Sequence, residues 1–130
     1  MDNKIKQLRK GILELAILGC LYHESHYGYS LVKTLSGEGD ITLTEGTIYP
    51  ILSRLAKEGL VRSEWIESQQ GPPRKYYSLT SEGKNTFEVL NIEFKKLAEL
   101  ILNADKEPEK KGQKEKRKKI LVKKEREDGK

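Results

Sequence analysis

Apolar residues recur every three or four positions from Ile5 onward, which predicts an amphipathic helix at the start of the chain. This helix is expected from about Asp2 or Asn3 to His23. Its first apolar face consists of Ile5, Leu8, Ile12 and Leu15. A second apolar face follows from Ile12 onward and consists of Leu13, Ala16, Ile17, Cys20 and Leu21. A helix that is apolar on two sides needs two packing partners.

Two shorter helices are predicted next. The second helix runs from about Tyr27 to Leu35 and is stopped by the glycines that follow it. Thr42 and Thr44 are the two candidate N-caps of the third helix. An i, i+3, i+4, i+7 pattern marks the core side of the third helix, which consists of Ile48, Ile51, Leu52 and Leu55. The same helical wheel places the following residues on or beside the opposite face: Gly46, Tyr49, Pro50, Ser53, Arg54 and Lys57.

The outer face of the third helix has an unusual combination of residues. Gly46 and Pro50 remove bulk near the helix start, which lets the backbone approach another large molecule, while the longer polar side chains supply reach. Pro50 costs one backbone hydrogen bond, and less if it lies within about the first turn. The alternative interpretation is a plain solvated face with a proline near its start.

A β-hairpin is predicted after the third helix. The segment LVRSEWIES, 60–68, is rich in strand-forming residues, QQGPP is typical of a turn, and RKYYSLT, 74–80, is a returning strand. Three helices followed by a hairpin predict a mainly α (α+β) winged helix-turn-helix, in which the third helix enters the DNA major groove. Arg74 and Lys75 follow two prolines, which hold the chain extended and present both cations on the wing.

Three segments, YGYSLVKTL, TEGTIYPILSRLAKEGLV and GPPRKYYSLTSEGK, resemble the PadR family of bacterial transcriptional regulators across roughly Leu8 to Leu102. The resemblance implies a dimeric repressor that binds a near-palindromic operator and is released by a small phenolic or hydrophobic effector. Unlike members with a long helical second domain, this chain has one last helix and a charged tail. The candidate DNA-binding residues are Tyr29, Thr47, Tyr49, Ser53, Arg54, Lys57, Arg74 and Lys75.

The last helix is expected from Ser81 to about Asn103 behind a Thr80 cap. Its apolar residues follow a heptad spacing that is too short for a free coiled coil, which favours packing against the first helix of a second copy. The alternative is a core helix within one chain. The candidate dimer and effector residues are Ile5, Leu8, Ile12, Leu15, Phe87, Leu90, Phe94, Leu97 and Ile101. Phe87 and Phe94 are the aromatic candidates for lining an apolar effector slot together with the first helix of the second copy, and the alternative is a closed, well-packed core.

The distribution of charge divides the 130-residue chain, whose formal net charge is +5. Residues 106–130 contain 12 Lys/Arg against 6 Asp/Glu, whereas the preceding 105 residues contain 13 against 14. The predicted divisions are therefore a winged helix-turn-helix over 1–80, a dimerisation helix over 81–103 and a basic, disordered tail over 104–130. The tail is expected either to add non-specific affinity for DNA phosphates or to act only as a solubilising segment.

Several protein classes are disfavoured by the sequence. The longest nearly apolar run, 12–22, is well short of the ~20 residues that cross a bilayer, and the start lacks the pattern of a signal peptide, so a cytoplasmic protein without membrane contact is expected. Cys20, His23 and His26 have a superficially zinc-like spacing, but no fourth ligand is evident. No phosphate loop or catalytic Ser/His/Asp set stands out, and neither an enzyme nor a cofactor is expected.

A winged helix can also serve as a protein-assembly module without reading DNA. The outer face of the third helix distinguishes the two functions, because a protein-docking face is expected to carry a larger apolar patch. Ser53, Arg54 and Lys57 are polar or cationic. DNA binding by a transcriptional regulator is therefore the favoured interpretation, with protein assembly as the alternative.

Overall fold

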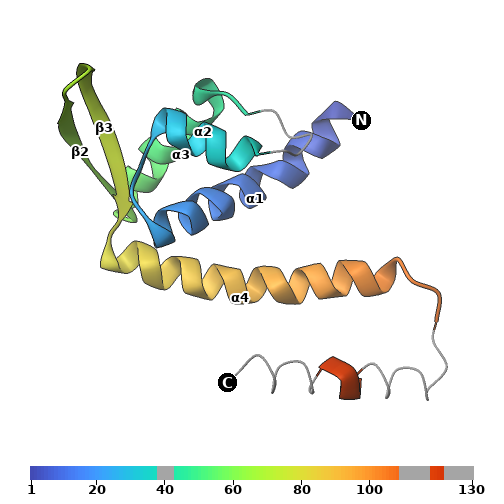
Figure 1. Ribbon diagram of the computed structural model, residues 1–130. Coiled ribbons are helices and arrows are strands. Elements are labelled where there is room, and N and C mark those ends of the chain that lie inside the picture. Colours follow the sequence, from blue (N-terminus) through green and yellow to red (C-terminus); the bar gives the residue numbers. More distant parts are fainter. Residues whose placement is uncertain (38–42, 109–117, 122–130) are drawn as a thin grey trace. The chain divides into compact units, whose positions relative to one another are not determined.

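The structure is a computed structural model that describes residues 1–37, 43–108 and 118–121. Residues Met1–Phe94 form one compact unit and Lys95–Lys130 a second. The elements follow in this order (Figure 1): α1 (Asp2–His23), β1 (His26–Tyr27), α2 (Gly28–Ser36), α3 (Glu45–Lys57), β2 (Val61–Ser68), β3 (Gly71–Leu79) and α4 (Ser81–Ala104). This arrangement of helices and hairpin is the predicted winged helix-turn-helix.

The hydrophobic core lies within the first unit, where α1, α2, α3 and the base of the hairpin meet. Its most completely buried side chains are Ile17, Leu18, Leu31, Ile48, Leu52 and Leu55. Burial of one such side chain contributes roughly 1.5–3 kcal/mol. The core side predicted for the third helix is therefore confirmed, although Ile51 is only partly buried.

The sheet contains a short strand that the sequence pattern does not predict. β1 pairs antiparallel with β3, with His26 opposite Tyr77 and Tyr27 opposite Tyr76, so that the strand order is β1-β3-β2. A two-residue strand has no alternation of its own, and its partner lies about fifty residues later in the chain. This pairing ties the start of α2 to the hairpin.

The hairpin of β2 and β3 forms the wing, and only its inner end is buried. Val61 and Leu79 are opposite each other and belong to the core. Farther out, Trp65 is opposite Lys75 and all four strand positions from Arg62 to Trp65 on β2 are exposed. The wing therefore depends on its own pairing beyond the core and presents its side chains outward.

The first turns of α4 pack on α1 of the same chain. Thr80 caps the helix as predicted, because its Oγ1 accepts a hydrogen bond from the Gly83 N–H at 3.0 Å. The Phe87 ring lies 5.0 Å from the Tyr22 ring, between centroids, and packs against the core. The Tyr22 hydroxyl donates to Glu88 Oε1 at 2.7 Å. Phe87, expected at a dimer interface, thus already contacts its own α1.

The predicted disordered tail falls largely on residues 109–117 and 122–130, which lie outside the described residues. α4 itself ends at Ala104, one residue beyond the predicted boundary. Within the described parts of the chain, no helix is both long enough and apolar enough to cross a membrane.

Candidate nucleic-acid interface

The outer face of α3 is polar and open. Gly46, Pro50, Ser53 and Lys57 are all exposed, on the side of the helix away from the core. A Cβ built on Gly46 would meet nothing closer than the Thr44 Oγ1, at 3.6 Å, among the described residues. The fold of the free chain therefore does not require a glycine at this position.

Pro50 is the sixth residue of α3 and therefore lies beyond the first turn, where its cost would be smallest. Since proline has no N–H, the carbonyl of Gly46 lacks its usual i+4 partner. The helix nevertheless continues to Lys57. Gly46 and Pro50 together leave a backbone carbonyl on a face with little side-chain bulk.

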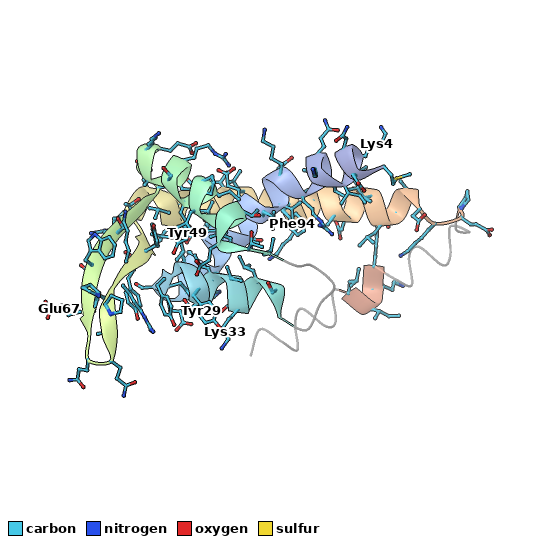
Figure 2. The ribbon with its side chains drawn as sticks, turned by 90° about the horizontal axis from the view of Figure 1, so that it is seen from above. Lys4, Tyr29, Lys33, Tyr49, Glu67 and Phe94 are labelled. Carbon is cyan, nitrogen blue, oxygen red and sulfur yellow. The ribbon has the colours of Figure 1, made fainter. Side chains whose placement is uncertain are left out.

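Tyr49 lies at the edge of this face, toward α2 (Figure 2). Its side chain is 43 % exposed, and its ring lies over Gly28, where an added Cβ would be 2.6 Å from the Tyr49 Cζ. Burial, with a smaller contribution from Glu45, raises the pKa of Tyr49. Gly28 therefore makes the space that holds the Tyr49 ring beside the start of α2.

Arg54 lies at the other edge of α3 and contacts α1. Its Nη2 donates to Glu14 Oε2 at 3.1 Å, and this ion pair is partly exposed. For Lys57 the structure records no ion pair among the described residues. The two cations predicted together as DNA contacts thus differ, because the charge of Arg54 is already paired within the chain.

Arg74 and Lys75 lie on opposite faces of the wing, because successive side chains of a strand alternate. The Arg74 guanidinium carbon lies 4.6 Å from the centroid of the Tyr27 ring. The Lys75 Nζ lies 5.9 Å from the Trp65 ring and 5.8 Å from the Tyr77 ring. The prediction of two cations on the wing is thereby refined to one on each face.

A line of aromatic and cationic side chains joins α2 to one wing face. Lys33 Nζ lies 5.5 Å from the centroid of the Tyr29 ring, and the Tyr29 ring stacks on the Tyr27 ring. The Arg74 guanidinium lies over the Tyr27 ring. Tyr29 and Lys33 are neighbours on α2 in Figure 2. Sequence reasoning named Tyr29 but missed Tyr27 and Lys33, although Lys33 follows Tyr29 by one helical turn.

Thr47 and Ser53 are exposed on α3, and the Thr47 hydroxyl lies 3.3 Å from that of Thr44. Cys20, His23 and His26 extend from α1 into β1, and no metal-binding group of three His, Cys, Asp or Glu occurs in the part of the chain that the structure describes. His26 is instead buried and its Nδ1 lies 2.9 Å from Ser30 Oγ.

Comparison with known proteins identifies the family. Residues 17–89, more than half of the chain, match the transcriptional regulator PadR-like family. The chain belongs to the PadR-like family. A PadR-like transcription factor from Bacteroides fragilis is 40 % identical, with 78 % of this chain and 98 % of that one covered and a TM-score of 0.66.

Two further solved structures are similar to this chain. A PadR-like regulator from Bacillus cereus strain ATCC 14579 is 34 % identical, with 78 % of this chain and 99 % of that one covered and a TM-score of 0.71. Bacillus subtilis PadR in complex with operator DNA has the same fold at 24 % identity, with 77 % and 50 % covered and a TM-score of 0.57. Because it belongs to the PadR-like family, this chain is a transcriptional regulator and not an enzyme.

Most of the apolar residues predicted for a dimer interface remain exposed on this PadR-like chain. On α1, Leu8 is 69 % exposed and Leu15 half-buried. On α4, Phe94 is 38 % exposed and Phe87 is half-buried against α1. The other exposed members are Ile5, Ile12, Leu90, Leu97 and Ile101.

Proposed function

We propose that this PadR-like regulator is a cytoplasmic repressor that binds a near-palindromic operator as a homodimer and is released by a small hydrophobic or phenolic effector. The outer face of α3 carries the proposal. It has a glycine that the fold does not require, a lysine with no ion pair among the described residues and no aliphatic side chain near its start. These properties suit a backbone that approaches DNA closely.

DNA contacts are proposed in two groups. Residues of α3 are placed to reach base edges and phosphates in the major groove, and they are Thr47, Tyr49, Ser53, Arg54 and Lys57. Tyr29, Arg74 and Lys75 flank this helix from α2 and the wing, where cations beside aromatic rings suit phosphates and the minor groove. Protein assembly by the same helix face is disfavoured, because that face offers no contiguous apolar patch.

Homodimerisation is supported by the exposed apolar residues of α1 and α4. Leu8, Ile12, Leu90 and Phe94 are large side chains at helical spacing that the chain leaves accessible to solvent. A second copy that covers these residues would satisfy both apolar sides of α1. It would also supply the twofold pairing of half-sites that a near-palindromic operator requires.

The effector proposal rests on the same residues. Since Phe87 already packs on Tyr22 of its own chain, Phe94 and the aliphatic residues beside it are the more accessible lining for a planar apolar compound. Titration of planar aromatic compounds, followed by Trp65 fluorescence and by release of DNA, tests this part. A panel that never releases DNA would exclude effector control by such compounds.

A gel-shift assay against the protein's own upstream region tests the central proposal. We expect a specific, salt-sensitive complex with a twofold footprint, and sedimentation of the free protein as a dimer. Variants Tyr49→Ala and Lys57→Ala should weaken this complex. Lys84→Ala, which removes one exposed lysine from the first turn of α4, is the matched control for the loss of a charge away from α3. Unchanged affinity of both α3 variants for a specific operator would show that α3 does not read DNA.

A further inference from the structure

Four elements of the first unit meet at one small joint. α3 ends at Lys57, β2 begins at Val61, β3 ends at Leu79 and α4 begins at Ser81. Gly59 and Leu60, which connect α3 to β2, contact Thr80, which connects β3 to α4, and Gly83 in the first turn of α4. We call these four residues the α3–α4 joint.

The Thr80 side chain links the two sides of the joint. Its hydroxyl donates to the carbonyl oxygen of Gly59 at 2.7 Å and accepts from the Gly83 N–H at 3.0 Å. The Thr80 N–H donates to the Leu60 carbonyl oxygen at 3.1 Å. One residue therefore connects the exit from α3 with the first turn of α4 through both its backbone and its side chain.

Gly83 lets the two backbones approach within contact distance. A Cβ on Gly83 would overlap the Leu60 carbonyl oxygen and would lie 3.0 Å from the Leu60 carbonyl carbon. Both atoms belong to the backbone, so no flexible side chain could move aside. The first turn of α4 is therefore held against the exit from α3 without an intervening side chain.

The exit from α3 is itself fixed. Gly59 has a φ of 77°, which favours glycine, and the Leu60 N–H returns to the Leu55 carbonyl oxygen at 3.0 Å. The Gly59 backbone conformation and this hydrogen bond together fix the position of Leu60 relative to the last turn of α3. The direction of α4 as it leaves Thr80 is thus coupled to the direction of α3 through a short series of backbone contacts.

We propose that the α3–α4 joint sets the separation and angle of the two α3 helices in the DNA-bound dimer, and so determines which half-site spacing an operator must have. This inference rests on the proposed function. The dimer residues lie on α1 and α4, whereas the reading residues lie on α3, and Tyr22 with Phe87 fixes the first turns of α4 on α1. Thr80 acts as a positioning residue that itself contacts no DNA.

The test compares Thr80→Val with Thr80→Ser in the full chain. Valine keeps the shape of threonine and removes both hydroxyl bonds, whereas serine retains them. The DNA probes are duplexes selected by the wild-type protein from a randomised pool. They are then remade with one half-site scrambled, or with the distance between half-sites changed in steps of one base pair.

We expect Thr80→Val to remain a dimer and to bind the single half-site within about twofold of the wild type. Its affinity for the duplex with the selected half-site spacing should fall about tenfold, and it should tolerate a wider range of spacings. Thr80→Ser should have the wild-type affinity and the wild-type spacing preference. Gly59→Ala, which strains the same joint from the α3 side, should give the same pattern if Thr80→Val does not fold.

Two results would overturn the inference in different ways. If a folded variant loses equal affinity for the half-site and the full operator, or keeps the wild-type spacing preference, Thr80 contributes only to the stability of the fold. If the wild-type protein selects no duplex at all, the proposed function itself fails, and the inference fails with it.

Discussion

Replacement of Gly46 by alanine separates the requirements of the fold from those of DNA binding. Gly46 is the second residue of α3, is exposed, and has no positive φ. The added methyl would meet only the Thr44 hydroxyl oxygen, at an ordinary 3.6 Å, among the described residues. Because alanine lowers the entropy of the unfolded chain and favours helix, Gly46→Ala should stabilise the free protein by up to about 1 kcal/mol.

The same methyl should weaken DNA binding. If the α3 backbone approaches the groove at Gly46, a methyl on its outer face must move the helix start outward and lengthen the contacts made by its neighbours. Loss of one good base contact corresponds to about 1–3 kcal/mol, or roughly 5- to 150-fold in Kd. The substitution is therefore expected to raise thermal stability and to lower operator affinity, two changes that a damaged fold would not produce together.

Thermal unfolding and operator titration at fixed salt measure the two effects, with Gly11→Ala as the matched control. Gly11 lies in α1, and none of the described atoms is within 4 Å of an added Cβ, so its replacement should also stabilise the helix, with no direct effect on DNA contact. Sedimentation checks that this control remains a dimer. Stabilised Gly46→Ala protein with wild-type operator affinity would refute a close approach of the backbone at Gly46.

Three further outcomes are expected. Lys57→Ala should make the negative slope of log K against log salt less steep by about 0.9. Arg54→Ala should change this slope by less, because the charge of Arg54 is already paired. Gly28→Ala should displace the Tyr49 ring and weaken operator binding in a folded protein. The hydrogen bond to the Glu88 carboxylate raises the pKa of Tyr22. This bond should therefore stabilise the fold below about pH 10, the usual tyrosine pKa, and the stabilisation should be lost as the pH rises above the raised pKa. In urea titrations, Tyr22→Phe should lose less stability at alkaline pH than the wild type.

Helix and hairpin positions were predictable because their signals are local. Apolar periodicity predicted α1 to its last residue, His23, and Thr80 caps α4 as predicted. Of the two candidate caps of α3, Thr42 lies outside the described residues, and Thr44 precedes the helix without a capping hydrogen bond from its side chain. The predicted turn was too long, because Gly71, Pro72 and Pro73 already belong to β3 and only Gln69 and Gln70 form the turn. The β1 strand was missed because its hydrogen bonds are made with residues far away in the chain, and no local pattern reports them.

The candidate site was predictable as a set of residues, but its contacts were not. Arg54 was correctly placed beside the outer face, yet its pairing with Glu14 depends on how α1 crosses α3. The position of Tyr49 over Gly28 likewise depends on the packing of α2. The opposite orientation of Arg74 and Lys75, in contrast, could have been predicted from the sequence, because successive side chains of a strand point to opposite faces.

Pro50 destabilises α3, and the core side of the same helix offsets this cost in free energy. A proline inside a helix costs about 3 kcal/mol or more relative to a residue that donates its N–H. Ile48, Leu52 and Leu55, on the opposite side, are at most 1 % exposed, and burial of each contributes roughly 1.5–3 kcal/mol. Burial on the core side therefore offsets the cost of the proline, while Pro50 itself is exposed and does not belong to the core. A destabilising residue near a dispensable glycine is best explained by a surface that the helix presents to a partner, and the polar neighbours of Pro50 support the proposal that this partner is DNA.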